Sequence, residues 1–147
     1  MNIYVPIEKL KFMNWKFFIS WVPGIPIAIF NGVIRGYWYQ QFLPEQQSHQ
    51  LSTLSFIILF GVYVWFILRW LKLPSTQAAL RLGLFWLVLT VAFEFLFGHF
   101  VMGYSWTTLF QDYNILAGRV WILVLVWITI TPVIFYLIKR GRSPSAT

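Results

Sequence analysis

Four apolar runs of membrane-spanning length dominate this sequence and leave few folds open to it. They place helices at about residues 17–34, 51–71, 79–101 and 120–138. Each run meets or approaches the ~20 residues that a helix needs to cross a hydrocarbon core of about 30 Å. Backbone groups facing lipid must bond within the chain, and the runs are too long and too evenly apolar for barrel strands. The sequence therefore predicts an all-α integral membrane protein, a four-transmembrane-helix bundle forming one domain over residues 1–147.

Composition agrees with this prediction and excludes several kinds of protein. Of the 147 residues, 59% are apolar and only 10% are charged, which is outside the range of soluble domains. The net charge is +7, but the basic residues stand in small groups beside the apolar runs, so we expect no nucleic-acid binding. The chain has no cysteine, which excludes disulfides, thiol catalysis and thiolate metal ligands.

The basic residues also predict an orientation. Only Arg35 and Arg119 fall on one side of the predicted bundle, and the other nine Lys and Arg fall on the opposite side. The positive-inside rule then puts both termini in the cytoplasm, and we expect the membrane to be a bacterial inner (plasma) membrane. The nine residues on the predicted cytoplasmic side are Lys9, Lys11, Lys16, Arg69, Lys72, Arg81, Lys139, Arg140 and Arg142.

Prolines and glycines predict where the helices bend or end. Pro23, Gly24 and Pro26 lie inside the first apolar run and are expected to kink or unwind it, because proline removes a backbone donor. Pro132 is expected to bend the fourth helix more mildly. Residues 73–76 form a tight turn, which predicts that the second and third helices are antiparallel neighbours.

The two longer connections are expected to face outward as ordered caps on the membrane surface. They cover residues 36–50 and 103–119 and are rich in Tyr, Trp, Gln and Asn. Pro44 is placed to open the second helix early, with Glu45 in the first turn, where carboxylates are favoured. We expect the tail, residues 143–147, to be disordered.

Glu94 is the residue of this sequence least easily explained by a structural role alone, because burying its charge in a membrane costs free energy. It lies about 10 to 13 Å inside the outer end of the third helix, where a charged carboxylate costs at least ~2.5 kcal/mol. It is therefore expected to be paired, hydrated or protonated. The functional interpretation is a proton carrier or cation ligand, and the structural alternative is a protonated side chain bonded to a neighbouring helix.

The two histidines could bind a metal or haem. Glu94 and His99 are five residues apart and point some 140° apart on a helix, so they do not form a same-face pair. His49 begins the second helix on the side where His99 ends the third, which would bring the imidazoles to a similar depth. No spaced ligand motif supports this site, and a loop hydrogen bond explains His99 equally well.

Asn31 and Arg35 share a face near the outer end of the first helix, because they are spaced i, i+4. Arg35 would bind an anionic ligand, reach phospholipid headgroups or pair with Glu94. Gly32 and Gly36 form a pair of small residues that predicts close helix approach.

The second outer connection adds Asp112, Asn114 and Arg119 to this side, either as a pocket or as a structural network that holds the loops. Tyr104, Trp106, Tyr113 and Trp121 suit an interfacial aromatic belt. The predicted ligand- or ion-binding residues are Glu94, His99, Arg35, Asn31, His49, Asp112, Asn114 and Arg119.

Three functions fit the sequence. The first is ion- or proton-coupled transport, or a channel, for a small solute, with Glu94 as the binding group and the protein acting as a homo-oligomer. The second is an outer-leaflet enzyme acting on a lipid or lipid-linked substrate, with His, Glu or Asp as acid and base and an arginine holding a phosphate. The third is an accessory subunit of a larger membrane complex. No phosphate loop, zinc-protease motif or serine nucleophile elbow is present.

Overall fold

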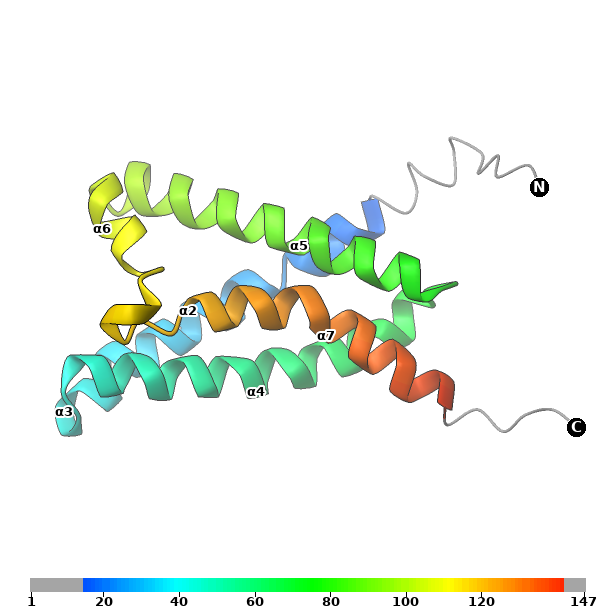
Figure 1. The fold of residues 1–147 in the computed structure, drawn as a ribbon, viewed down its shortest axis with the longest axis horizontal. Coiled ribbons are helices and arrows are strands. Elements are labelled where there is room, and N and C mark those ends of the chain that lie inside the picture. Colours follow the sequence, from blue (N-terminus) through cyan, green and yellow to red (C-terminus); the bar gives the residue numbers. More distant parts are fainter. Residues whose placement is uncertain (1–14, 142–147) are drawn as a thin grey trace, which may run out of the picture.

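A computed structural model describes residues 15–141. These residues are helical throughout apart from short connections, and no strand occurs among them (Figure 1). Four helical segments are long and apolar enough to cross a membrane, which confirms the prediction of four such helices: Trp15–Phe42, Glu45–Leu71, Thr76–Val101 and Ile122–Gly141. The predicted disordered tail, at residues 143–147, lies outside the described residues.

The first segment is interrupted where its prolines stand. Residues 15–21 are helical, a turn occupies residues 22–23, and α2 (Gly24–Ile34) resumes beyond it. Pro23 and Pro26 have no amide hydrogen to donate, so the helical ladder is weakest here. Beyond α2 the chain winds into the wider π-helical turn η1 (Arg35–Tyr39) and ends in α3 (Gln40–Phe42). The predicted break near Pro23 is therefore confirmed.

A proline before α4 and a serine cap before α5 explain why these two helices begin earlier than predicted. α4 (Glu45–Leu71) starts directly after Pro44, with Glu45 in its first turn as predicted, six residues before the expected start. α5 (Thr76–Leu96) starts after Ser75, whose Oγ accepts a hydrogen bond of 3.1 Å from the Ala78 amide. The α5 helix continues into the π-helical turn η2 (Phe97–Val101).

Three further helices complete the chain. α6 (Trp106–Gln111) and the 3₁₀ turn η3 (Ile115–Ala117) make up the long connection after α5. α7 (Ile122–Gly141) then runs unbroken through Pro132 to the end of the described residues. In Figure 1, α3, α6 and η3 lie at one end of the bundle, which we call the loop end. The α4–α5 turn and the end of α7 lie at the other, which we call the basic end.

Helix α7 lies between α4 and α5, as Figure 1 shows. It packs closely against both, whereas α4 and α5 approach each other chiefly through large side chains such as Phe60 and Trp86, with ring centroids 5.7 Å apart. The prediction that the second and third helices are antiparallel neighbours is therefore confirmed in their direction and in this side-chain contact, but it missed the closer packing of α7 against both. The short turn makes them antiparallel, but α7 packs between them, and its Val124 and Ile128 are buried in the core.

Helices α5 and α7 approach each other closely at Gly83 of α5. A methyl group added there would stand 2.0 Å from the backbone oxygen of Thr129 on α7. Gly32 and Gly36, which the sequence suggested for this role, would have no neighbouring atom within 4 Å of such a methyl. Within the described chain the small-residue prediction is therefore wrong for Gly32 and Gly36, and Gly83 takes that role.

Candidate functional site

A cavity of about 310 Å³ lies at the loop end, and we call it the outer pocket. Six of the eight predicted binding residues line it, and they come from α2, η1, α4, α5 and the α6–α7 connection. His99 and Asn114 are not among its lining residues. The six are Asn31, Arg35, His49, Glu94, Asp112 and Arg119.

Aromatic and aliphatic side chains make up most of the remaining wall of the outer pocket. Next to the outer pocket, on its side toward the basic end, Trp21 of the first helical segment contacts α5. Its Nε1 donates a hydrogen bond to Thr90 Oγ1 at 3.0 Å, and its ring packs edge-on against Phe93. A small number of polar groups in an otherwise apolar cavity is typical of a small-molecule site. The apolar and aromatic lining includes Ala28, Ile29, Phe93, Phe95, Phe97, Met102, Leu109, Tyr113, Val120 and Trp121.

The Glu94 carboxylate is held by two neutral donors. The Tyr113 hydroxyl donates to Oε2 at 2.6 Å, and Trp121 Nε1 donates to Oε1 at 2.9 Å. No Lys, Arg or His among residues 15–141 forms an ion pair with Glu94. The suggested pair with Arg35 is therefore absent from this arrangement. A carboxylate fixed by neutral donors keeps its orientation without having its charge cancelled by a basic side chain.

Tyr113 remains a hydrogen-bond donor in this position. It lies in the α6–α7 connection, and burial, reinforced by the neighbouring Glu94 charge, raises the pKa of its phenol above the ordinary value. The sequence assigned Tyr113 and Trp121 only to an aromatic belt. No feature of the sequence separates a belt residue from one that turns inward to bind a carboxylate.

Asn31 is nearly completely buried, with 3% of its surface exposed. Its Nδ2 donates to the Ser52 carbonyl at 2.9 Å and to Ser52 Oγ at 2.8 Å. Because the carbonyl can only accept, the nitrogen must face Ser52, and this fixes the orientation of the amide. Its Oδ1 is left buried without a hydrogen-bond partner among the described residues. A buried acceptor without a partner costs free energy and is the kind of group that a ligand satisfies.

A chain of charged groups forms the rim of the outer pocket. Arg35 Nη1 donates to His49 Nδ1 at 3.3 Å, and His49 Nε2 stands 4.0 Å from Glu45 Oε1. Because arginine cannot accept, Nδ1 carries the lone pair, which leaves the hydrogen on Nε2 toward Glu45. Arg119 lies 3.8 Å from both Glu45 and Asp112 and so connects α4 to the α6–α7 connection. These exposed pairs contribute about 0–1 kcal/mol each, but they position the loops over the pocket.

The two residues outside the outer pocket have local structural roles. His99 Nδ1 donates to the Tyr104 carbonyl at 2.8 Å, and its ring stacks on Trp106 at 3.9 Å. Asn114 Oδ1 caps η3 by accepting from the Ala117 amide. The two histidines thus have different partners, and no group of three or more His, Cys, Asp and Glu gathers within residues 15–141. The geometry gives no support to a metal or haem held by His49 and His99.

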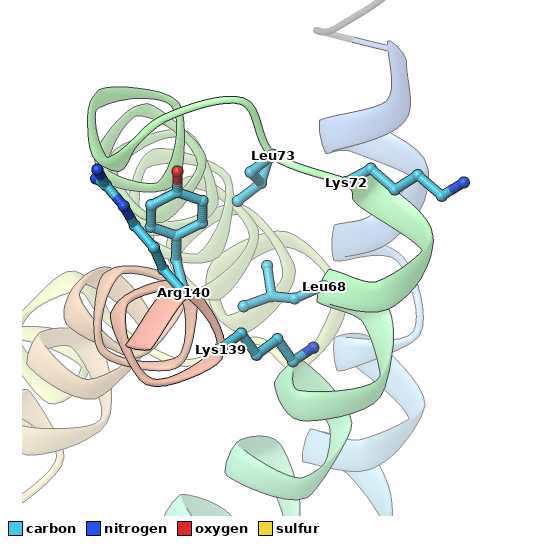
Figure 2. Close-up of a pocket in the computed structure, with 6 residues that line it drawn as sticks. Leu68, Lys72, Leu73, Lys139 and Arg140 are labelled. Carbon is cyan, nitrogen blue, oxygen red and sulfur yellow. The ribbon is translucent and has the colours of Figure 1, made fainter. Parts of the chain in front are cut away.

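A second, smaller cavity of about 210 Å³ lies at the basic end, between the ends of α4 and α7 (Figure 2). Leu68, Lys72 and Arg140 are among its lining residues. Lys139 also lines it, but its Nζ is bonded to the Trp65 carbonyl at 2.7 Å. In Figure 2 the Lys72 side chain runs away from the other sticks. One of its two lysines is thus turned away and the other is already bonded, and we take the outer pocket, where six predicted residues meet, as the candidate site.

Comparison with known proteins gives no relative from which a function could be transferred. No family model, no curated protein and no solved structure matches this chain. The function is therefore argued from the outer pocket alone.

Proposed function

We propose that this protein is a small membrane transporter or channel in which Glu94 of the outer pocket binds the transported ion or the coupling proton. The observation that carries the proposal is the setting of Glu94. Its carboxylate lines a cavity and is oriented by Tyr113 and Trp121, and no basic residue of the described chain forms an ion pair with it. A charged group at membrane depth needs a counter-charge, and a proton or a cation in the cavity supplies it.

The proposal includes an orientation. The loop end faces outward and both termini face the cytoplasm, in a bacterial inner membrane, because six of the eight Lys and Arg among residues 15–141 lie toward the basic end. Glu94 would then receive its cation from outside.

A pathway to the cytoplasm must be created by movement or by assembly. Between the outer pocket and the basic end the bundle is closed by buried side chains, of which Trp86 and Val64 are 1% and 0% exposed. The break at residues 22–23 is a natural hinge for the first helix. A chain with so little interior also favours a route between protomers, so we propose a homo-oligomer.

Purified protein in liposomes tests this proposal. The liposomes carry an internal pH-sensitive dye and an imposed membrane potential, and amines and amino acids are then added one by one. We expect proton movement that requires wild-type protein, falls to the level of empty liposomes in Glu94→Gln, and persists in Arg81→Gln, a charge change on the same helix near the basic end. Equal signals from wild type, Glu94→Gln and empty liposomes would overturn the proposal and favour the accessory-subunit interpretation.

The rim supports a second candidate, an outer-leaflet enzyme acting on a lipid or lipid-linked substrate. His49 Nδ1 accepts from Arg35 and its Nε2 lies on the side of Glu45, so His49 would act as a base once Arg35 leaves Nδ1 to bind a substrate phosphate. Incubation of the protein with a labelled lipid extract tests it. Turnover that is lost in His49→Gln would support the enzyme, and an unchanged extract would exclude it for the lipids present.

A further inference from the structure

The outer pocket holds an unpaired cation as well as an unpaired anion. Arg35 contacts only the neutral nitrogen of His49, and no acid among residues 15–141 forms an ion pair with it. Glu94 is in the converse position, with neutral donors and no basic partner. Both side chains line the same cavity, and they are not paired with each other.

The two charges come from different helical segments at a similar depth. Arg35 stands seven residues before the end of the segment Trp15–Phe42, and Glu94 stands seven residues before the end of Thr76–Val101. At helical rise both therefore lie roughly 10 Å inside the loop end of their segments. A cation and an anion that share a cavity without touching leave a space between them that a ligand with both charges would fill.

The free acceptors of the pocket match an ammonium group. An ammonium carries three N–H donors, and a carboxylate offers about four acceptor positions, of which Tyr113 and Trp121 occupy two at Glu94. Asn31 Oδ1 supplies a further acceptor, buried and without a partner in the described chain. Aromatic side chains in the wall, among them Phe95, Tyr113 and Trp121, belong to the class that attracts organic cations.

The free donors match an anionic group at the other side. Arg35 has five N–H donors in a fork suited to a carboxylate or a phosphate, and only one contact, to His49, is made in this arrangement. Arg119 at the same rim is already shared between Glu45 and Asp112, so Arg35 is the cation left for a ligand.

We propose that the outer pocket binds a zwitterion, whose ammonium group contacts Glu94 and Asn31 and whose carboxylate or phosphate contacts Arg35. This inference rests on the proposed function and names the class of its solute. The shared chemistry is an ammonium a short distance from an anion, and it occurs both in free amino acids and phosphoethanolamine and in the headgroup of ethanolamine phospholipids.

Ligand-induced stabilisation of the full chain in detergent tests the proposal without any transport step. Thermal unfolding is followed by tryptophan fluorescence while leucine, phosphoethanolamine or short-chain dihexanoyl phosphatidylethanolamine is titrated. Ethanolamine and methyl phosphate serve as single-charge probes, meaning that each carries charge of one sign only. We expect at least one zwitterion to bind about tenfold or more tightly than either single-charge probe. Tighter binding of the dihexanoyl lipid than of phosphoethanolamine assigns the site to a lipid headgroup, and the reverse assigns it to a free solute.

Variants show whether both charges are used. Arg35→Gln should reduce the affinity for the zwitterion to that for ethanolamine, Arg35→Lys should retain part of it, and Arg81→Gln should leave it unchanged. Zwitterions that bind no better than ethanolamine to folded wild-type protein would overturn the proposal, as would equal affinities in wild type and Arg35→Gln. Glu94-dependent proton flux without zwitterion binding would remove this inference alone, and binding without flux would remove the transport proposal alone.

Discussion

Replacing Gly83 by alanine should separate the two most closely packed helices of this protein. The new methyl group would lie 2.0 Å from the Thr129 oxygen, whereas ordinary van der Waals contact begins at about 3.4 Å, so α5 and α7 must part by more than an ångström. The obstacle is backbone, which cannot rotate aside. Overpacking of this kind costs about 1–3 kcal/mol, and alanine recovers about 0.5–1 kcal/mol of helix propensity. We expect a net loss of about 1 kcal/mol.

Gly32→Ala is the matched control, because a methyl group there meets no atom within 4 Å. It should be neutral or more stable by up to about 1 kcal/mol. Thermal and denaturant unfolding of both variants in one detergent measures the difference, with Gly83→Ala melting several degrees lower. If Gly83→Ala were as stable as wild type, or if Gly32→Ala were the damaging change, the α5–α7 packing described above would be wrong.

Three further predictions concern the loop end. Tyr113→Phe removes one hydrogen-bond donor from Glu94 and should lower the unfolding free energy by about 1–3 kcal/mol in detergent melts. The control, Tyr37→Phe at an exposed tyrosine, should change the unfolding free energy little. Because folding raises the pKa of Tyr113, its hydroxyl stabilises the fold fully below the ordinary pKa of about 10, and this stabilisation is lost as the pH rises further. The unfolding free energy of wild type should therefore fall faster in strong alkali than that of Tyr113→Phe. Arg119→Gln breaks two exposed ion pairs and should cost no more than about 2 kcal/mol, yet it should speed proteolysis of the α6–α7 connection. Unchanged cleavage would show that these pairs do not hold the connection in place.

Hydropathy and proline positions predicted the number of long helices and one break within them, but not how the helices pack. Four apolar runs predict four long helices, and proline marks the break at residues 22–23. The order of packing could not be predicted, because helices that are apolar on every side carry no stripe that points to a partner. Only the structure shows that α7 lies between α4 and α5 and that Gly83, rather than Gly32, permits a close approach of two helices.

The candidate site was predictable in its residues and not in its contacts. Glu94 is conspicuous because a carboxylate at membrane depth is costly, and five other predicted residues join it in the outer pocket. Its donors, Tyr113 and Trp121, belong to a connection whose fold depends on local caps such as Asn114 and Ser105. The sequence contains these caps, but it does not show which way the aromatic side chains turn once the connection folds over the bundle.

The proposal depends above all on Glu94 exchanging a proton or a cation in the outer pocket, and infrared difference spectroscopy measures this directly. Spectra of the protein in lipid are compared between acid and neutral pH, and with and without added cations. We predict a component of the change in the carboxyl stretching bands that is present in wild type and Arg81→Gln and missing from Glu94→Gln, in which the other three acidic side chains still give their own signal. A Glu94 signal that stays constant under every condition in which the protein remains folded would contradict the account and leave Glu94 with a structural role only.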